Sequence, residues 1–200
     1  MSGIAAVKPS NWNLPNALTT LRILMVPFFG FALLIHGGDS VGWRLLAFLL
    51  FVAAMVTDKV DGDIARSRHL ITNFGKIADP IADKALTGMA FVGLSVIGEL
   101  WWWVTVVVLV REWGITLLRL WLAGDGLVVA ANRGGKAKTV LQTVALASLV
   151  LPVRLVHGGW DTIGTALWWV AAVLLGFAVL VTVVTGVDTL VKALAARRSR

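Results

Sequence analysis

Long apolar runs, separated by short polar or glycine-containing stretches, dominate the chain. A helix needs roughly 20 apolar residues to cross the about 30 Å of hydrocarbon in a bilayer. Six runs approach or exceed this length, and we place membrane-spanning helices at residues 21–36, 41–66, 77–97, 100–120, 139–156 and 163–194. The pattern therefore predicts an all-α integral membrane protein that forms a single domain over residues 1–200.

The segment before the first run, residues 11–20, mixes polar and apolar residues. Pro15 suits the first turn of a helix, and Trp12 and Leu14 suit a segment that lies at a membrane surface. We therefore expect a short N-terminal interfacial helix there. Gly37 and Gly38 are expected to end the span that follows.

Composition agrees with a membrane protein. Hydrophobic residues make up 58% of the chain and charged residues only 14%, whereas soluble proteins carry about 25% charged residues. The net charge of +7 would suggest a nucleic-acid partner in a soluble protein, but here the basic residues alternate with apolar spans. We expect membrane lipids, and no nucleic acid, around this chain.

The basic residues also orient the spans, because Lys and Arg collect on cytoplasmic loops. One set of loops carries only Arg44 and Arg154. The other set carries most of the positive charge: Lys8, Arg66, Arg68, Lys76, Arg133, Lys136, Lys138, Lys192 and the terminal arginines. The charge bias predicts a multi-pass protein of the inner (plasma) membrane with both termini on the cytoplasmic side.

Four aspartates lie near that cytoplasmic side. On a helix with about 100° per residue, Asp58 and Asp61 share an arc of about 140° with Gly62, Ala65 and Arg66. Gly75, Asp79 and Asp83 share one face of the next helix, at spacings of four. The connection between the two helices is short, so they can be antiparallel neighbours whose acidic faces meet.

Four carboxylates at a membrane boundary need compensating charge, because each ion near hydrocarbon costs about 2.5–3.5 kcal/mol. Arg66 is expected to balance one of them. Mg²⁺ or Mn²⁺ suits the rest, since both ions prefer oxygen ligands. Zinc is a poorer fit, because the chain has no cysteine and His69 is a lone histidine nearby. Two such cations about 3.5–4 Å apart can clamp the oxygens of a phosphoryl displacement.

These residues read as D-x-x-D-G-x-x-A-R, eight further residues, and G-x-x-x-D-x-x-x-D. The string resembles the signature of the CDP-alcohol phosphotransferase family at every defined position, with Asp63 at a free position. The resemblance implies a six-span fold and the transfer of a substituted phosphoryl group from a CDP-linked lipid or alcohol to a hydroxyl, with release of CMP. By the same resemblance, two divalent cations are held by Asp58, Asp61 and Asp79, with Asp83 as a neighbour of the metals and the general base. The CDP-lipid site is implied at Asp61, Gly62, Ala65, Arg66 and Gly75.

Three further stretches resemble the phosphatidylglycerophosphate synthases within that family: residues 14–22 (LPNALTTLR), 111–119 (REWGITLLR) and 135–142 (GKAKTVLQ). Arg111 and Arg119 lie two helical turns apart and point roughly the same way. Lys136 and Lys138 begin a helix, where the dipole favours an anion. Together with Arg22, these residues are the expected site for the acceptor phosphate. The alternative for Arg111 is a structural pair with Glu112 or with another span, and the pair with Glu112 is the less favoured of the two, because adjacent helix residues do not face each other.

The predicted reaction transfers the phosphatidyl group of CDP-diacylglycerol to sn-glycerol 3-phosphate, giving phosphatidylglycerophosphate and CMP. The acceptor hydroxyl attacks the β-phosphorus. Within the family, inositol phosphate or phosphatidylglycerol are alternative acceptors, which would make the enzyme a phosphatidylinositol phosphate synthase or a cardiolipin synthase. Outside enzymes, the acidic residues could belong to a divalent-cation transporter, although the other end of the spans lacks a second acidic layer.

We also expect a homodimer. Members of the resembled family often form homodimers, and the third span offers a face of small residues at Gly88, Ala90 and Gly93 that suits close helix packing.

Overall fold

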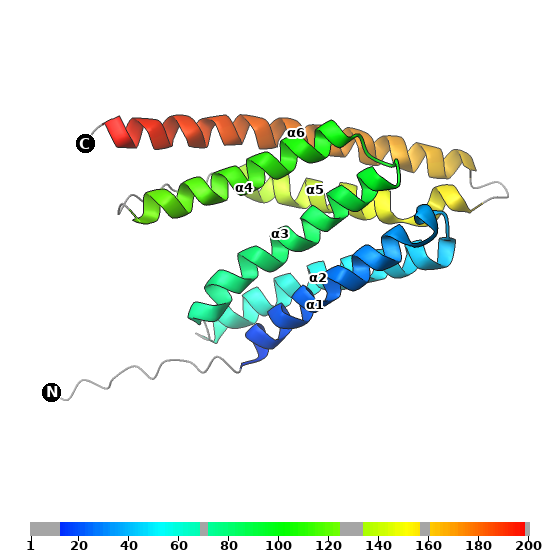
Figure 1. Cartoon of the computed structure of the whole chain (residues 1–200), viewed down its shortest axis with the longest axis horizontal. Coiled ribbons are helices and arrows are strands. Elements are labelled where there is room, and N and C mark those ends of the chain that lie inside the picture. Colours follow the sequence, from blue (N-terminus) through cyan, green and yellow to red (C-terminus); the bar gives the residue numbers. More distant parts are fainter. Residues whose placement is uncertain (1–12, 69–71, 125–133, 157–160, 199–200) are drawn as a thin grey trace.

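The computed structural model describes residues 13–68, 72–124, 134–156 and 161–198, and every regular element within these residues is helical (Figure 1). The prediction of an all-α protein is confirmed. The elements are α1 (Leu14–Leu34), the 3₁₀ helix η1 (Ile35–Gly38), α2 (Val41–Ser67), α3 (Asn73–Val96), α4 (Trp102–Gly124), α5 (Gly134–Val150), the 3₁₀ helix η2 (Pro152–Leu155) and α6 (Asp161–Arg198).

Helix α1 differs from the expectation at the N-terminus. Its first turn is capped by Asn13, whose side chain accepts a hydrogen bond from the Asn16 backbone N–H at 3.0 Å. The helix then continues without interruption to Leu34, so one helix replaces the separate interfacial helix and first span. No glycine or proline stands between residues 16 and 26 to break it, and the Thr20 hydroxyl bonds back to the Asn16 carbonyl inside the helix.

Gly37 and Gly38 end the first helical segment, as expected. Gly37 and Gly38 have φ values of 67° and 82°, a left-handed conformation that glycine adopts at little cost.

Four helical segments in the described part of the chain are long and apolar enough to cross a membrane: Leu14–Gly38, Val41–Ser67, Lys138–Leu155 and Thr162–Ala193. Helices α3 and α4 have 24 and 23 residues, about 35 Å at 1.5 Å per residue, but the first half of α3 and the part of α4 from Arg111 onward carry charged side chains. The membrane character is thus supported, while the count of six spans stays a prediction. Large apolar side chains such as Phe28, Val110 and Phe177 are more than half exposed, as contact with lipid requires.

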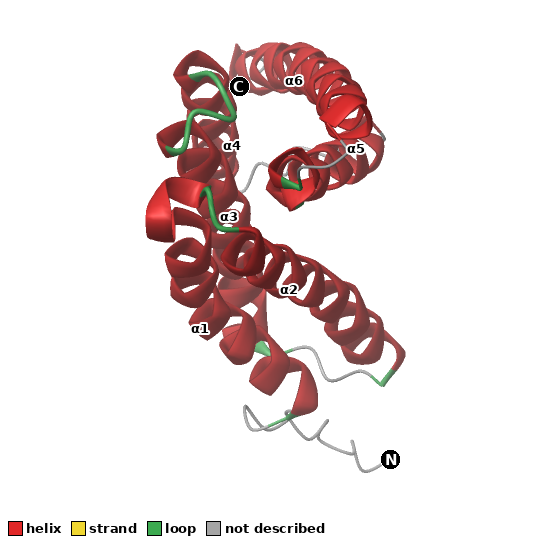
Figure 2. Ribbon diagram, turned by 90° about the vertical axis from the view of Figure 1, so that its right-hand side faces the viewer, coloured by secondary structure: helices red, strands yellow, loops and turns green. Residues whose placement is uncertain are grey.

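The helices form two groups that share one core. Helix α1 packs against α2 and α3, and α6 packs against α4 and α5, while α3 contacts both α4 and α5 (Figures 1 and 2). One continuous cluster of buried apolar side chains runs through both groups, from Phe29 and Phe91 to Leu146 of α5 and Leu175 of α6.

Small residues of α3 are used inside this core. A Cβ added to Gly93 would lie 2.5 Å from Leu33 of α1, and Ala90 is fully buried. Gly88 faces Leu109 of α4 at ordinary contact distance. The face that we expected to support a dimer is therefore covered within one chain.

The first turn of α1 and the last turn of α6 lie at the same end of the bundle (Figure 1). The end of α2 and the start of α3 lie there too, so the predicted aspartates gather at that end.

Candidate active site

The four aspartates come from the last turns of α2 and the first turns of α3. Thr72 caps α3, since its hydroxyl accepts a hydrogen bond from the Gly75 N–H at 3.0 Å. The charge of Asp58 interacts with those of Asp61, Asp79 and Asp83. The structure thus brings the two acidic faces together, as their helical spacing predicted.

Arg22 of α1 bridges the two aspartates of α2. Its Nη1 lies 2.5 Å from Asp58 Oδ1, its Nη2 bonds Asp61 Oδ2, and its side chain is only 1% exposed. We had placed Arg22 at the acceptor phosphate, but its ion pairs put it among the aspartates. It supplies the balancing cation that we expected from Arg66.

Arg66 instead forms its ion pair with Asp63, at 2.8 Å. Both side chains are about two-thirds exposed, and a pair this exposed contributes little energy. A Cβ added to Gly62 would lie 3.3 Å from the Arg66 guanidinium, so the glycine lets this side chain lie close over α2. The pair with Asp63 therefore holds the Arg66 side chain only weakly.

Residues at the start of α1 also form hydrogen bonds with residues at the start of α3. Thr19 donates a hydrogen bond to Asp79 Oδ1 at 2.6 Å. Asn16 Oδ1 accepts one from Thr72 Oγ1 at 3.0 Å, and a Cβ on Gly75 would lie 3.0 Å from that same oxygen. Sequence reasoning did not assign Asn16 or Thr19 to the site. Their spacing of three from each other and from Arg22, which puts all three on one helix face, was the available signal.

The donors at this site are carboxylate and hydroxyl oxygens, which are the ligands that Mg²⁺ and Mn²⁺ prefer. Among the described residues, no three acidic or histidine side chains are placed to hold one ion, and Arg22 bridges Asp58 and Asp61. The bridge itself shows that these two carboxylates accommodate positive charge between them. The residue types therefore fit divalent cations.

A second ionic cluster lies beside Asp83, with Glu112 of α4 at its centre. Glu112 Oε1 accepts hydrogen bonds from Arg111 Nη1 at 2.9 Å and from Lys138 Nζ, and its Oε2 lies 3.6 Å from Lys84 Nζ. The charge of Asp83 interacts with those of Lys84 and Glu112. We call these four bonded residues (Lys84, Arg111, Glu112 and Lys138) the Glu112 cluster.

Arg111 makes both of the structural contacts considered from the sequence, including the pair with Glu112 that we had disfavoured. The guanidinium is long enough to reach its chain neighbour while it also bonds α6: Nε donates to the Thr182 carbonyl at 3.0 Å and Nη2 to Thr185 Oγ1 at 2.7 Å. A Cβ on Gly186 would lie 3.1 Å from Arg111 Cγ, so this glycine makes room for the arginine.

The predicted acceptor residues thus separate in the structure. Arg111 and Lys138 belong to the Glu112 cluster, whereas Arg22 lies with the aspartates. Arg119 and Lys136 lie in α4 and α5, but their side chains fall outside the described part of the structure. Lys84 and Glu112 were missed, although both follow directly on residues that the sequence had singled out.

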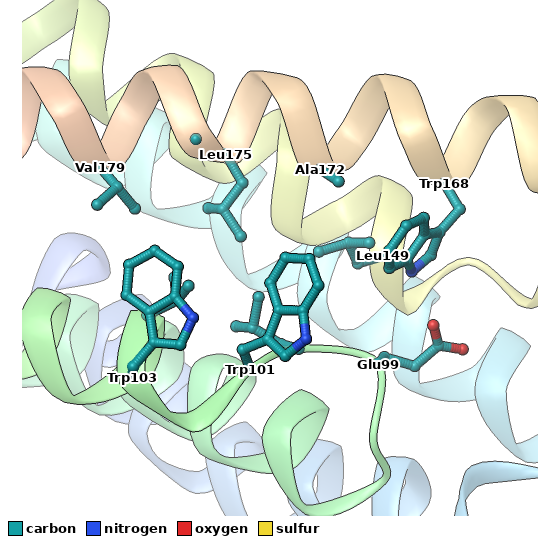
Figure 3. Close-up of a pocket in the computed structure, with 11 residues that line it drawn as sticks. Glu99, Trp101, Trp103, Leu149, Trp168, Ala172, Leu175 and Val179 are labelled. Atoms are coloured by element: carbon teal, nitrogen blue, oxygen red, sulfur yellow. The ribbon is translucent and has the colours of Figure 1, made fainter.

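Two cavities differ in their relation to this site. A groove of about 500 Å³ between α1 and α3 is lined mainly by apolar residues, with Asn16 at its polar side: Asn13, Asn16, Ala17, Thr20, Leu21, Leu24 and Phe74. A second cavity of about 110 Å³ lies between α4 and α6, where Trp101 and Trp103 face Leu175 and Val179 (Figure 3). The second cavity is at the far end of α3, whereas the groove lies at the end of the bundle that holds the aspartates.

A family model described as CDP-alcohol phosphatidyltransferase matches residues 12–184. The chain belongs to this family. The resemblance read from the aspartate signature is confirmed, and the match covers Arg22, the four aspartates and the Glu112 cluster.

Relatives within the family are similar over most of their length. A "Probable phosphatidylglycerophosphate synthase" of Mycobacterium tuberculosis (strain ATCC 25618 / H37Rv) is 45% identical over 91% of this chain and 82% of the relative. A "CDP-diacylglycerol--glycerol-3-phosphate 3-phosphatidyltransferase" of Bacillus subtilis (strain 168) is 42% identical over 70% of this chain and 77% of the relative. A protein of the same name from Rickettsia typhi (strain ATCC VR-144 / Wilmington) is 38% identical over 87% of this chain and 93% of the relative.

Proposed function

We propose that this chain transfers the phosphatidyl group of CDP-diacylglycerol to sn-glycerol 3-phosphate, forming phosphatidylglycerophosphate and CMP. The observation that carries the proposal is the position of the Glu112 cluster beside Asp83. An aspartate site typical of the family adjoins a mostly buried group of three cations, which suits a phosphorylated acceptor. The names of the relatives described above support the same acceptor.

The donor is proposed to bind at the ends of α2 and α3. Asp58, Asp61 and Asp79, with Asp83 beside them, would hold two divalent cations, Mg²⁺ or Mn²⁺. These cations would neutralise the pyrophosphate charge and the charge that develops on departing CMP.

The rest of the CDP-lipid site is proposed at Asp61, Gly62, Ala65, Arg66 and Gly75. The exposed Arg66 guanidinium can reach a phosphate of the donor, because its pair with Asp63 is weak. The apolar groove between α1 and α3 offers a place for an acyl chain next to the aspartates.

The acceptor phosphate is proposed to bind at Arg111 and Lys138, with Arg119 and Lys136 as further candidates. Arg22 was predicted to join them, and its ion pairs with Asp58 and Asp61 support a role on the donor side instead.

Asp83 is proposed as the general base, since its charge interacts both with Asp58 and with Lys84 and Glu112 of the Glu112 cluster. It takes the proton of the acceptor's primary hydroxyl as that oxygen bonds the β-phosphorus. The bond from this phosphorus to the bridging oxygen breaks, and CMP leaves with the electron pair. Proton transfer of this kind contributes about 10²–10⁴-fold to a rate.

An assay of the purified protein tests the acceptor. CDP-diacylglycerol is supplied with Mg²⁺ or Mn²⁺ and, in parallel, with glycerol 3-phosphate, inositol phosphate or phosphatidylglycerol. We expect CMP release and a lipid phosphomonoester product with glycerol 3-phosphate. Turnover with only one of the other two acceptors would identify a phosphatidylinositol phosphate synthase or a cardiolipin synthase. Divalent-cation uptake into vesicles with no CMP release would identify a transporter.

We propose that the protein lies in the inner (plasma) membrane with both termini and the active site on the cytoplasmic side. The exposed Arg66 and Arg68 at the aspartate end support this orientation, while Arg44 at the other end is buried within the bundle. A homodimer is also proposed on family likeness, through a surface other than the Gly93 face.

A further inference from the structure

The Glu112 cluster gathers charges from three helices. Lys84 comes from α3, Arg111 and Glu112 from α4, and Lys138 from α5. Each side chain in it is less than a fifth exposed, and Lys138 is only 6% exposed. Three cations this close repel one another, and an anion among them offsets that repulsion.

Glu112 is that anion. Its Oε1 accepts hydrogen bonds from Arg111 and Lys138, while its Oε2 lies close to Lys84 Nζ. Arg111 has a second anchor in α6, through Thr182 and Thr185, but the ammonium groups of the two lysines are flexible point charges. The carboxylate therefore determines where the lysine charges converge.

One carboxylate does not neutralise three cations, so the four bonded residues keep a net charge of +2. A phosphomonoester carries between about −1.5 and −2 at pH 7. A phosphodiester carries one negative charge and a free alcohol none. The cluster therefore matches the charge of a phosphomonoester better than that of the other two classes of acceptor.

We infer that Glu112 is the positioning residue of the acceptor site, which aims Lys84, Arg111 and Lys138 at the phosphomonoester of the acceptor and selects for that group. The inference rests on the proposed function and adds Lys84 and Glu112 to the acceptor site. Because Asp83 borders the cluster, a phosphate held there leaves the acceptor hydroxyl near the base.

The test compares Glu112→Gln and Glu112→Asp with the native protein. Glutamine keeps the shape and an accepting oxygen but removes the charge. We expect Glu112→Gln to raise the KM for glycerol 3-phosphate roughly 10- to 100-fold, the worth of a charge-assisted hydrogen bond. The KM for CDP-diacylglycerol should stay within about threefold, because the donor site is separate. Glu112→Asp, which restores the charge, should recover a large part of the loss.

Glu99→Gln is the matched control. Glu99 is also mostly buried and also paired with two cations, Arg44 and Arg154, but it lies at the far end of α3. We expect it to lower stability without changing the KM for either substrate. Equal changes in both KM values for Glu112→Gln, or an unchanged or lower acceptor KM, would overturn the positioning role.

A binding measurement separates this inference from the proposed function. Inorganic phosphate is titrated into the native protein and the Glu112→Asp and Glu112→Gln variants without CDP-lipid, and thermal stabilisation is followed. We expect phosphate to stabilise the native protein most and Glu112→Gln least. If glycerol 3-phosphate is not a substrate but this order holds, the proposed function fails while the phosphate site stands. If phosphate stabilises Glu112→Gln as well as the native protein, the inference fails whatever the acceptor is.

Discussion

At both the aspartate site and the Glu112 cluster, one charged side chain forms ion pairs with several residues of opposite charge. Arg22 pairs with Asp58 and Asp61, and Glu112 pairs with Lys84, Arg111 and Lys138. Because both central ions are mostly buried, removal of either leaves uncompensated charges, at a cost of about 3–5 kcal/mol. The two ions therefore offer direct tests of the site.

Arg22→Gln should make the protein's stability depend more strongly on divalent cations. Without metal, Asp58 and Asp61 lose their partner, and we expect a loss of about 3–5 kcal/mol. Added Mg²⁺ or Mn²⁺ binds the freed carboxylates and should restore much of this loss, since a ligand of the folded state stabilises it. Thermal unfolding in detergent, followed by tryptophan fluorescence with EDTA or metal, measures both effects. Arg66→Gln, at an exposed pair, is the control, and an equal metal-induced gain in Tm for all three proteins would refute the proposal that these aspartates bind metal.

Asp83→Asn should reduce kcat by about 10²–10⁴-fold, because the amide cannot accept the proton of the acceptor hydroxyl. Binding of CDP-diacylglycerol should persist, which a competition assay with labelled CDP-lipid can show. Asp39→Asn, at an exposed position in the loop before α2, is the control and should keep native turnover. Native turnover in Asp83→Asn would exclude Asp83 as the base.

At the scale of elements, a single arginine secures the end of the bundle opposite the aspartates. Arg44 of α2 is 3% exposed and bonds the carbonyls of Leu149 at 2.7 Å and Val150 at 3.1 Å, where α5 ends. It also lies 3.5 Å from Glu99 in the turn between α3 and α4. The last carbonyls of a helix lack partners within the helix, and Arg44 supplies them.

Arg44→Met should therefore destabilise the protein by about 3–5 kcal/mol, because it leaves Glu99 and two helix-end carbonyls short of partners. Arg154→Met is the matched control. Arg154 is 47% exposed and also pairs with Glu99, so its loss should cost less than about 1 kcal/mol. Unfolding of the two variants in detergent measures the difference. The KM values should not change in either variant, and similar stabilities of the two would contradict the capping role.

Helix periodicity predicted which aspartates share a helix face, but it did not predict that Arg22 of α1 pairs with them. The contacts from Arg22 to Asp58 and Asp61 cross 36 and 39 positions of chain, and they depend on how α1 is rotated against α2. The reach of long side chains was also underestimated, as the pair of Arg111 and Glu112 shows. Local spacing determines the faces of a helix, whereas packing determines which faces meet.

Helix bounds show a related pattern. At the aspartate end, the helices extend past the predicted limits: α3 begins at Asn73 instead of residue 77, α4 ends at Gly124 instead of residue 120, and α5 begins at Gly134 instead of residue 139. A prediction from apolar runs stops at the first polar residues. The backbone hydrogen bonds of a helix continue beyond the hydrocarbon, so these polar turns stay helical, and they carry Gly75 and Lys138 of the site.

At the scale of the whole molecule, all six α-helices contribute residues to the aspartate site, to the Glu112 cluster or to their hydrogen-bond partners. Thr19 and Arg22 come from α1, and the hydroxyl and carbonyl partners of Arg111 come from α6. The aspartate signature in the sequence identified only the site residues that lie on α2 and α3. The remaining helices supply side chains whose roles depend on the assembled bundle.

The same arrangement makes the orientation testable, because the chain has no cysteine of its own. Ser67→Cys places an exposed thiol at the aspartate end, and Asp39→Cys places one at the opposite end. If the aspartates face the cytoplasm, a membrane-impermeant maleimide added to spheroplasts should label Asp39→Cys in the intact state. It should label Ser67→Cys only after the membrane is permeabilised. The reverse order would put the donor and acceptor sites outside the cell, where CDP-lipid could not be supplied from the cytoplasm, and would contradict both the orientation and the proposed reaction.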